Sequence, residues 1–276
     1  MTPDSMAPDR SAPDSGAPDS SRRLPTEHSV VVQVRSVSMA FGGLLALGGV
    51  DLDVSRGERL AILGPNGAGK TTLFNVVAGD LIPTTGTVHL QGEDCTRLPS
   101  RHRPALGVAR TFQKARSFPG LSVEDNLYLA VVGRRGGHRR LWPASDDARR
   151  RERARSASTA VWLEKHLQTR VSELSHGQKR QLEIGMALAS DPQVLLLDEP
   201  ASGLSRGERE RLTELLDALP VDVTLLLIEH DMDVAFQVAR RVVVMSDGKV
   251  VAAGTPEQVQ ADPLVHEIYL GSQALA

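Results

Sequence analysis

Three features that define large classes of proteins are scarce in this sequence. Its 276 residues include one cysteine, Cys95, so the chain forms no internal disulfide and does not depend on an oxidising compartment. Its longest apolar runs, such as residues 221–228, are interrupted by polar side chains and fall far short of the ~20 residues that span a bilayer. The N-terminal residues contain no apolar stretch like a signal peptide. We therefore expect a cytosolic chain that does not cross a membrane alone.

Aromatic side chains and net charge are also scarce. Two Trp, two Tyr and five Phe make up 3% of the chain, and the formal net charge is -2. Proteins that coat nucleic acid usually carry a basic surface with aromatic rings for base stacking, so we expect no nucleic-acid partner. The hydrophobic fraction of 41% and the charged fraction of 24% are ordinary for a folded protein. The length suffices for one large domain or two small ones.

Two segments have a composition unlike the rest of the chain. Proline recurs at Pro3, Pro8, Pro13 and Pro18, each time followed by aspartate, and the first 29 residues carry too few apolar side chains to form a core. We predict that residues 1–29 are a disordered tail. Residues 134–155 contain nine arginines, which is typical of a solvated face. The alternative for this stretch is contact with anionic lipid headgroups or an acidic partner.

From Val30 onward, apolar strands alternate with amphipathic helices. Residues 121–170 are expected to be helical with a break, and the first of these helices starts near Ser122 and Asp125. The pattern predicts a parallel sheet covered on both faces. The expected strands are residues 30–37, 50–54, 59–63, 87–90, 194–197 and 223–228, with a glycine-rich connection at 41–49. Helices are expected after residue 72 and at 178–189, 206–219 and 231–240, and a hairpin at 242–251 that turns at Asp247–Gly248.

A glycine-rich loop follows the strand at 59–63. Gly64, Gly69, Lys70 and Thr71 satisfy the pattern GxxxxGK[ST], which a chain of this length matches by accident roughly once in a hundred. The glycines let backbone N–H groups converge on phosphate oxygens, and the following helix adds the positive end of its dipole. Lys70 is placed to reach the terminal phosphates and the Thr71 hydroxyl to ligate Mg²⁺. The strand before the loop and the helix after it favour a phosphate site over a plain turn.

Two further segments could act on phosphates. The apolar strand at 194–197 ends in Asp198 and Glu199, which are placed to hold Mg²⁺ and to polarise an attacking water. Paired acids could also merely cap a strand. Ser175 and Gln178 predict a capping box at the start of a helix. That helix N-terminus, with Gly177 in its first turn, is also a phosphate receptor.

Together these motifs resemble the ATP-binding subunits of ABC transporters. The Walker A loop at 64–71, the signature at 174–178 and the Walker B strand at 194–199 occur in that family's order, with the signature about 20 residues before Walker B. The resemblance covers about residues 30–272. It implies an α/β fold: a P-loop NTPase (RecA-like) core with a small antiparallel β subdomain and an α-helical subdomain inserted at about 114–175. Residues 273–276 would be a short C-terminal end.

The resemblance also assigns roles within the site. Gln113 corresponds to the family's Q-loop glutamine, His230 to the switch histidine that contacts the γ-phosphate, and Phe41 to the aromatic residue that stacks on adenine. Glu199, His230 and Gln113 would be catalytic, and Thr71, Gln113 and Asp198 would hold Mg²⁺. The implied ATP contacts are Phe41, Gly64, Pro65, Asn66, Gly67, Ala68, Gly69, Lys70, Thr71 and Thr72 of one chain, and Ser175, Gly177 and Gln178 of a second chain.

Two residues depart from the family's pattern. His176 stands where the signature usually has glycine, and its side chain can point away from the phosphate receptor. Ser205 stands where the D-loop usually ends in Asp or Asn. With Glu208 it predicts another capping box, so we still expect a helix to start here. The departure puts in doubt the contact that the D-loop makes with the second subunit.

Within the family, the chain is most similar to branched-chain amino acid importers of the LivG type. The segments that carry this similarity are Phe41–Gly43, 64–75, 107–113, 182–184, 254–263 and 269–271. The resemblance implies an ATPase that powers uptake of branched-chain or other hydrophobic amino acids from the cytoplasmic face of the cell membrane. Its partners would be integral-membrane permease subunits, a second ATPase subunit, preferably a paralogue, paired head to tail, and a periplasmic or lipid-anchored solute-binding protein. Urea and short-amide importers are close alternatives.

Other classes fit the sequence less well. ABC ATPases of translation or DNA repair usually carry two nucleotide domains or a long coiled-coil insertion, and this chain has neither. P-loop kinases and GTPases share the loop at 64–71 but do not require the signature or His230. An inactive scaffold is disfavoured because Lys70, Asp198 and Glu199 are intact.

Overall fold

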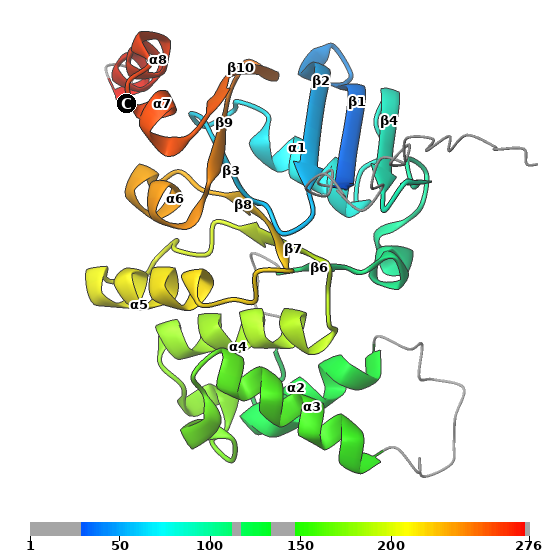
Figure 1. The fold of residues 1–276 in the computed structure, drawn as a ribbon, viewed down its shortest axis with the longest axis vertical. Helices are drawn as coiled ribbons and strands as arrows, with labels where there is room; N and C mark the ends of the chain where they lie inside the picture. Colours follow the sequence, from blue (N-terminus) through cyan, green and yellow to red (C-terminus); the bar gives the residue numbers. More distant parts are fainter. Residues whose placement is uncertain (1–28, 112–116, 134–146, 274–276) are drawn as a thin grey trace, which may run out of the picture.

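The computed structural model describes residues 29–111, 117–133 and 147–273. Two sheets and a group of helices make up this part of the chain (Figure 1). The predicted tail up to residue 28, Gln113, and the first part of the arginine-rich stretch, residues 134–146, lie outside the described residues.

The smaller sheet is antiparallel, with the order β2-β1-β4-β5. Strands β1 (Val30–Phe41) and β2 (Leu44–Ser55) are longer than predicted, and β4 (Thr85–Leu90) and β5 (Glu93–Asp94) complete the sheet. The glycine-rich segment 41–49 is therefore a hairpin and not the predicted connection. Its turn lies at Gly42–Gly43, and the pairing of β1 with β2 changes register on either side of Met39. Glycines inside strands mark such bulges, which the sequence pattern does not distinguish from a loop.

The larger sheet has six strands in the order β10-β9-β3-β8-β7-β6. The five strands from β9 to β6 are parallel, and β10 closes the edge as an antiparallel hairpin that turns at Asp247–Gly248, as predicted. Every residue of β3, β7 and β8 is buried, because a parallel sheet is covered on both faces. The strands are β3 (Arg59–Leu63), β6 (Val108–Arg110), β7 (Val194–Asp198), β8 (Thr224–Ile228), β9 (Arg241–Ser246) and β10 (Lys249–Gly254).

Two hydrophobic cores lie on opposite faces of this sheet. Leu60 and Ile62 of β3 pack with the antiparallel sheet and with Phe74 of α1 (Lys70–Ala78). Ala61 and Leu63 belong to the other core. That core includes α5 (Arg206–Asp217) and α6 (Met232–Val238). Successive side chains of β3 point to opposite faces of the sheet. The strand that leads into the glycine loop is therefore packed into both cores.

Three helices form a separate group on the side away from the antiparallel sheet (Figure 1). They are α2 (Val123–Gly133), α3 (Asp147–Ala160) and α4 (His176–Ala189). As predicted, the Ser122 hydroxyl accepts a hydrogen bond from the Asp125 amide, 3.1 Å, at the start of α2. A side chain at Gly185 would lie 2.9 Å from Val161 and 3.2 Å from Leu127, so glycine lets α4 pack closely on its neighbours.

The C-terminal segment ends in two helices, α7 (Pro256–Gln260) and α8 (Pro263–Gln273). Thr255 and Gln258 form a capping box at the start of α7. Among the described residues, none of the helices has the length and apolar character needed to cross a membrane.

Candidate functional site

The loop between β3 and α1 depends on glycine at two positions. Gly64 and Gly69 have positive φ angles of 147° and 95°, and a side chain on either would collide with backbone, at Met245 and at Ala46 respectively. Gly69 immediately precedes α1 and has no side chain to cap it. The first N–H groups of α1 are therefore not satisfied by a cap, and the positive end of the helix dipole faces the loop.

Lys70 places a cation inside this loop. Its side chain is buried, and Nζ donates hydrogen bonds to the carbonyl oxygens of Gly64, 2.5 Å, and Pro65, 2.9 Å. Burial lowers the pKa of the Lys70 ammonium, and the nearby carboxylates of Glu199 and Asp198 oppose that shift. Glycine amides and a held ammonium together form a site for an anion.

Asp198 ends β7 with a carboxylate that is only 1% exposed. Neither of its oxygens accepts a hydrogen bond from the described residues, and Arg110 Nη2 lies 3.8 Å from Oδ2. Burial raises the pKa of Asp198. A buried carboxylate with two unused oxygens fits a hard divalent cation. Within the described ranges, no group of three or more His, Cys, Asp or Glu side chains is arranged to hold a metal ion.

Glu199 and His230 come together because β7 and β8 are parallel neighbours that end at the same edge. The Nδ1 atom of His230 lies 3.9 Å from the Glu199 carboxylate. Glu199 has a φ of 45°, an uncommon backbone conformation for a residue with a side chain. Its amide donates to the Ile228 carbonyl, 2.9 Å, which ties the turn after β7 to the end of β8.

The start of α4 has the predicted capping box. The Gln178 amide donates to the Ser175 hydroxyl, 3.2 Å, and the Ser175 amide donates to the Gln178 side chain, 2.9 Å. The Gly177 amide donates to Glu208 Oε1 of α5, 2.9 Å. A Cβ at Gly203 would lie 3.4 Å from the His176 ring, so this ring lies beside the loop before α5.

The other predicted residues occupy separate places. Phe41 ends β1 with 46% of its surface exposed, so its ring is available to a planar ligand. Ser205 and Glu208 form the predicted capping box at the start of α5. The structure brings the loop at 64–72, Asp198, Glu199 and His230 to one region, because β3, β8 and β7 are adjacent. It places Ser175–Gln178 on α4, in the helical group.

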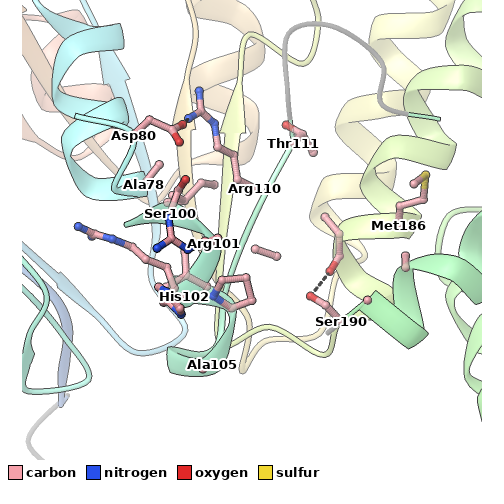
Figure 2. A pocket seen from close by; sticks show the side chains of 18 of the residues that line it. Ala78, Asp80, Ser100, Arg101, His102, Ala105, Arg110, Thr111, Met186 and Ser190 are labelled. Atoms are coloured by element: carbon pink, nitrogen blue, oxygen red, sulfur yellow. Dashed lines mark hydrogen bonds and ion pairs between the residues drawn. The ribbon is translucent and has the colours of Figure 1, made fainter. Parts of the chain in front are cut away.

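A groove of about 850 Å³ lies between the helical group and the larger sheet. The 3₁₀ helix Ser100–Leu106 and β6 form one wall, and Met186 of α4 and Ser190, which directly follows α4, lie on the other (Figure 2). Glu183 of α4 also lines the groove. Asp80 and Arg110 form an ion pair at this groove. The groove adjoins Thr111, the last described residue before Gln113.

Comparison with known families identifies the chain. Residues 47–202 match the ABC transporter family. The chain belongs to that family. Residues 249–274 of this ABC cassette match a second family, the branched-chain amino acid ATP-binding cassette transporter. The earlier prediction of an ABC ATP-binding subunit is therefore confirmed.

Curated relatives and solved structures agree with this assignment. The cassette is 39% identical over 258 residues to the high-affinity branched-chain amino acid transport ATP-binding protein BraF of Pseudomonas aeruginosa, covering 87% of this chain and 98% of that protein. It is 37% identical over 255 residues to LivG of Escherichia coli K12, with the same coverage. A solved ATP-binding cassette of an ABC transporter superposes with a TM-score of 0.78 at 29% identity, covering 87% of this chain and 99% of that one. The predicted P-loop NTPase fold is confirmed.

Sequence reasoning missed three residues of the ABC cassette that touch the site. Arg110 contacts Asn75 of α1, 2.8 Å, and approaches Asp198. Glu229 is fully buried and accepts hydrogen bonds from the amides of Ala201, 2.9 Å, and His230, 3.2 Å. Burial raises the pKa of Glu229. Arg180 of α4 is the third, and its contacts are given below. Of these three residues, only Glu229 had a signal in the sequence, because it is an acidic residue directly before His230.

Proposed function

We propose that the chain binds and hydrolyses ATP to power the import of branched-chain amino acids through separate membrane permease subunits. The observation that carries the proposal is the meeting of the Lys70 loop with the Asp198–Glu199 turn at one edge of the parallel sheet. The solute class is supported by the match of residues 249–274 and by the names of the relatives at 37–39% identity. These relatives favour branched-chain amino acids over urea and short amides.

Each side chain has a role that its position supports. Lys70 and the amides of residues 64–72 would hold the phosphates, and the exposed Phe41 ring would stack on adenine. Glu199 would accept a proton from the attacking water, and His230 would contact the γ-phosphate. Mg²⁺ held by Asp198, Thr71 and Gln113 would neutralise charge on the terminal phosphates. The unused oxygens of Asp198 support this cation site, and Gln113 lies outside the described residues.

The second half of each ATP site would come from another chain. Ser175, Gly177 and Gln178 would contact the nucleotide bound by the partner in a head-to-tail pair, preferably with a paralogue. A dimeric bacterial ABC transporter cassette superposes with a TM-score of 0.68 at 25% identity, covering 82% of this chain and 98% of that one. This likeness supports pairing, and loss of the γ-phosphate would then loosen the pair.

The remaining partners follow from an import system. The permease subunits would dock at the groove between the helical group and the sheet, which places the chain peripherally at the cytoplasmic face of the membrane. A periplasmic or lipid-anchored binding protein would supply the solute. We assign residues 30–272 to the ATPase domain and about 114–175 to its helical insert, and the mutual packing of α2, α3 and α4 supports that insert.

The experiment has two arms. The first compares ATP binding and phosphate release by the purified full chain and its Glu199→Gln variant. We expect equal ATP binding and a loss of turnover of ~10²–10⁴-fold, the range of general base catalysis. Near-normal hydrolysis by the variant would remove Glu199 from this role.

The second arm measures uptake of labelled leucine and labelled urea by cells with and without the gene. Loss of urea uptake alone would overturn the solute assignment.

A further inference from the structure

Arg180 lies in the first turns of α4, two residues after Gln178. Its side chain is only 12% exposed. Because arginine is rarely buried without a partner, the groups that this side chain contacts are informative. The role proposed above for the start of α4, contact with a second chain's nucleotide, makes no use of Arg180. Its guanidinium points instead toward the sheet of its own chain.

The guanidinium contacts three consecutive carbonyl oxygens after β7. Nη2 donates to the Asp198 carbonyl, 3.1 Å, and to the Glu199 carbonyl, 2.8 Å. Nε donates to the Pro200 carbonyl, 2.9 Å. One side chain of α4 thus donates to the carbonyl oxygens of both acidic residues and of the proline that follows them. Hydrogen bonds from a charged donor are stronger than neutral ones.

This turn needs such support because Glu199 has a φ of 45°. A left-handed backbone at a residue with a side chain costs free energy and persists only where its surroundings hold it. The Glu199 amide is held by Ile228, 2.9 Å, and its carbonyl by Ser202, 3.1 Å, and by Arg180. Arg180 is the one of these three that reaches the turn from the helical group.

Glu183 orients the guanidinium from one turn further along α4. Its Oε2 atom lies 2.6 Å from Arg180 Nη1, and the Glu183 side chain is also only 12% exposed. Glu183 at the same time lines the groove of about 850 Å³. The two side chains therefore connect the wall of the groove to the backbone of Asp198 and Glu199.

We propose that Arg180 is a positioning residue for ATP hydrolysis: it holds the turn that carries Asp198 and Glu199, and Glu183 holds Arg180 from the wall of the groove. The proposal rests on the ATPase function proposed above. Arginine suits this role because its planar fork offers five donors in fixed directions. A lysine ammonium keeps the charge but cannot reach three carbonyl oxygens in the same geometry.

The test measures kcat, KM, ATP affinity and melting temperature for the full chain and for Arg180→Lys, Arg180→Ala and Glu183→Gln. Because the hydrogen bonds of Arg180 within the described residues go to Glu183 and to the Asp198–Pro200 backbone, we expect Arg180→Lys to lower kcat at least ~10-fold and to change KM and ATP affinity less than ~2-fold. Glu183→Gln should lower kcat by a smaller factor. In the Arg180→Ala background Glu183→Gln should have no further effect, since the two side chains act as one unit.

Arg151→Lys and Arg151→Ala are matched controls. Arg151 also pairs with an acidic residue one turn away on a helix, Asp147, 3.3 Å, but it lies on α3 and is not part of the site. Both controls should hydrolyse ATP like the unchanged chain. If Arg180→Ala fails to fold, Arg180→Lys decides the question.

Three results would overturn the proposal. The first is an Arg180→Lys variant whose kcat equals that of the original chain, measured where the original chain hydrolyses ATP. This result would leave the proposed ATPase function in place. The second is a loss confined to KM or ATP affinity. The third is a lower melting temperature with normal kcat well below it, because that describes a structural role alone. An unchanged chain without Mg²⁺-dependent hydrolysis would overturn the ATPase function and this role together.

Discussion

The loop before α1 and the start of α4 are both glycine-containing helix N-termini, and the free chain satisfies them in opposite ways. In the loop, the Lys70 ammonium donates to two backbone carbonyl oxygens, with the Asp198 and Glu199 carboxylates nearby. At the start of α4, the Gly177 amide already donates to a carboxylate, Glu208. The first turn of α1 thus has no side-chain cap, whereas the Gly177 amide is already bonded to a carboxylate of its own chain.

This difference has a consequence for nucleotide binding. A phosphate that enters the loop meets a cation and uncapped amides, so a single chain is ready to bind ATP there. A phosphate that approaches Gly177 meets the negative charge of Glu208. Hydrogen bonds from Ser205 and from the Gly177 amide lower the pKa of Glu208. In the proposed pair, the second region would become a receptor only when the partner's nucleotide displaces this contact.

The largest effect should come from removing the cation of the first region. Lys70→Ala is expected to weaken ATP binding by ~100-fold, the worth of about one or two charge-assisted hydrogen bonds, and to abolish hydrolysis. Fluorescent ATP titration of the isolated chain measures the change, with the exposed Lys249→Ala as control. Affinity within a few fold of the unchanged chain would show that the loop does not bind phosphate through Lys70.

The next effect separates the two regions directly. Ser175→Arg puts a bulky cation at the start of α4 and should suppress hydrolysis by ~10²-fold, because the partner's nucleotide no longer fits. ATP binding by the isolated chain should not change. If Ser175→Arg loses ATP affinity as severely as Lys70→Ala, the two regions do not belong to different chains of a pair.

A stability measurement tests the unused carboxylate of the first region. Asp198→Asn should raise the unfolding free energy of the nucleotide-free chain by ~1–2 kcal/mol at pH 7, because it removes a buried charge without a hydrogen-bond partner. Since burial raises the pKa of Asp198 above 3.8, the folded unchanged chain binds the proton more tightly than the unfolded one, and its stability falls as the pH rises through that raised pKa.

The gain from Asp198→Asn should therefore shrink as the pH falls toward 3.8. Urea unfolding at several pH values checks this, with Glu210→Gln as a control at an exposed ion pair, Arg206–Glu210. A destabilised variant at pH 7 would mean that the carboxylate is paired in the free chain.

The smallest effect concerns the carboxylate at the second region. Glu208→Gln retains an oxygen that accepts from Gly177 but removes the negative charge. ATP-dependent pairing of chains should tighten ~2–5-fold, since an exposed charge contributes little. Sedimentation of the variant in the Glu199→Gln background measures pairing. Weaker pairing would show that Glu208 supports the receptor and does not compete with the nucleotide.

Much of the fold and site is predictable because the signals are local. The alternation of buried strands and helices, the glycine loop, the Asp247–Gly248 turn and the capping boxes at Ser175 and Ser205 depend on residues a few positions apart. The extent of the β1–β2 hairpin was mispredicted, because glycines at bulges and glycines in loops look alike in the sequence.

The sequence by itself determined which groups could bind a nucleotide: the Lys70 loop, Asp198 with Glu199, and the capped start of α4. Only the tertiary structure decided what those groups do in the free chain. Arg180 reaches carbonyl oxygens 18 to 20 residues away, Glu229 an amide 28 residues away, and Glu208 an amide 31 residues away. Such contacts arise where neighbouring strands and helices end together, and that packing is set by the whole core and not by local spacing.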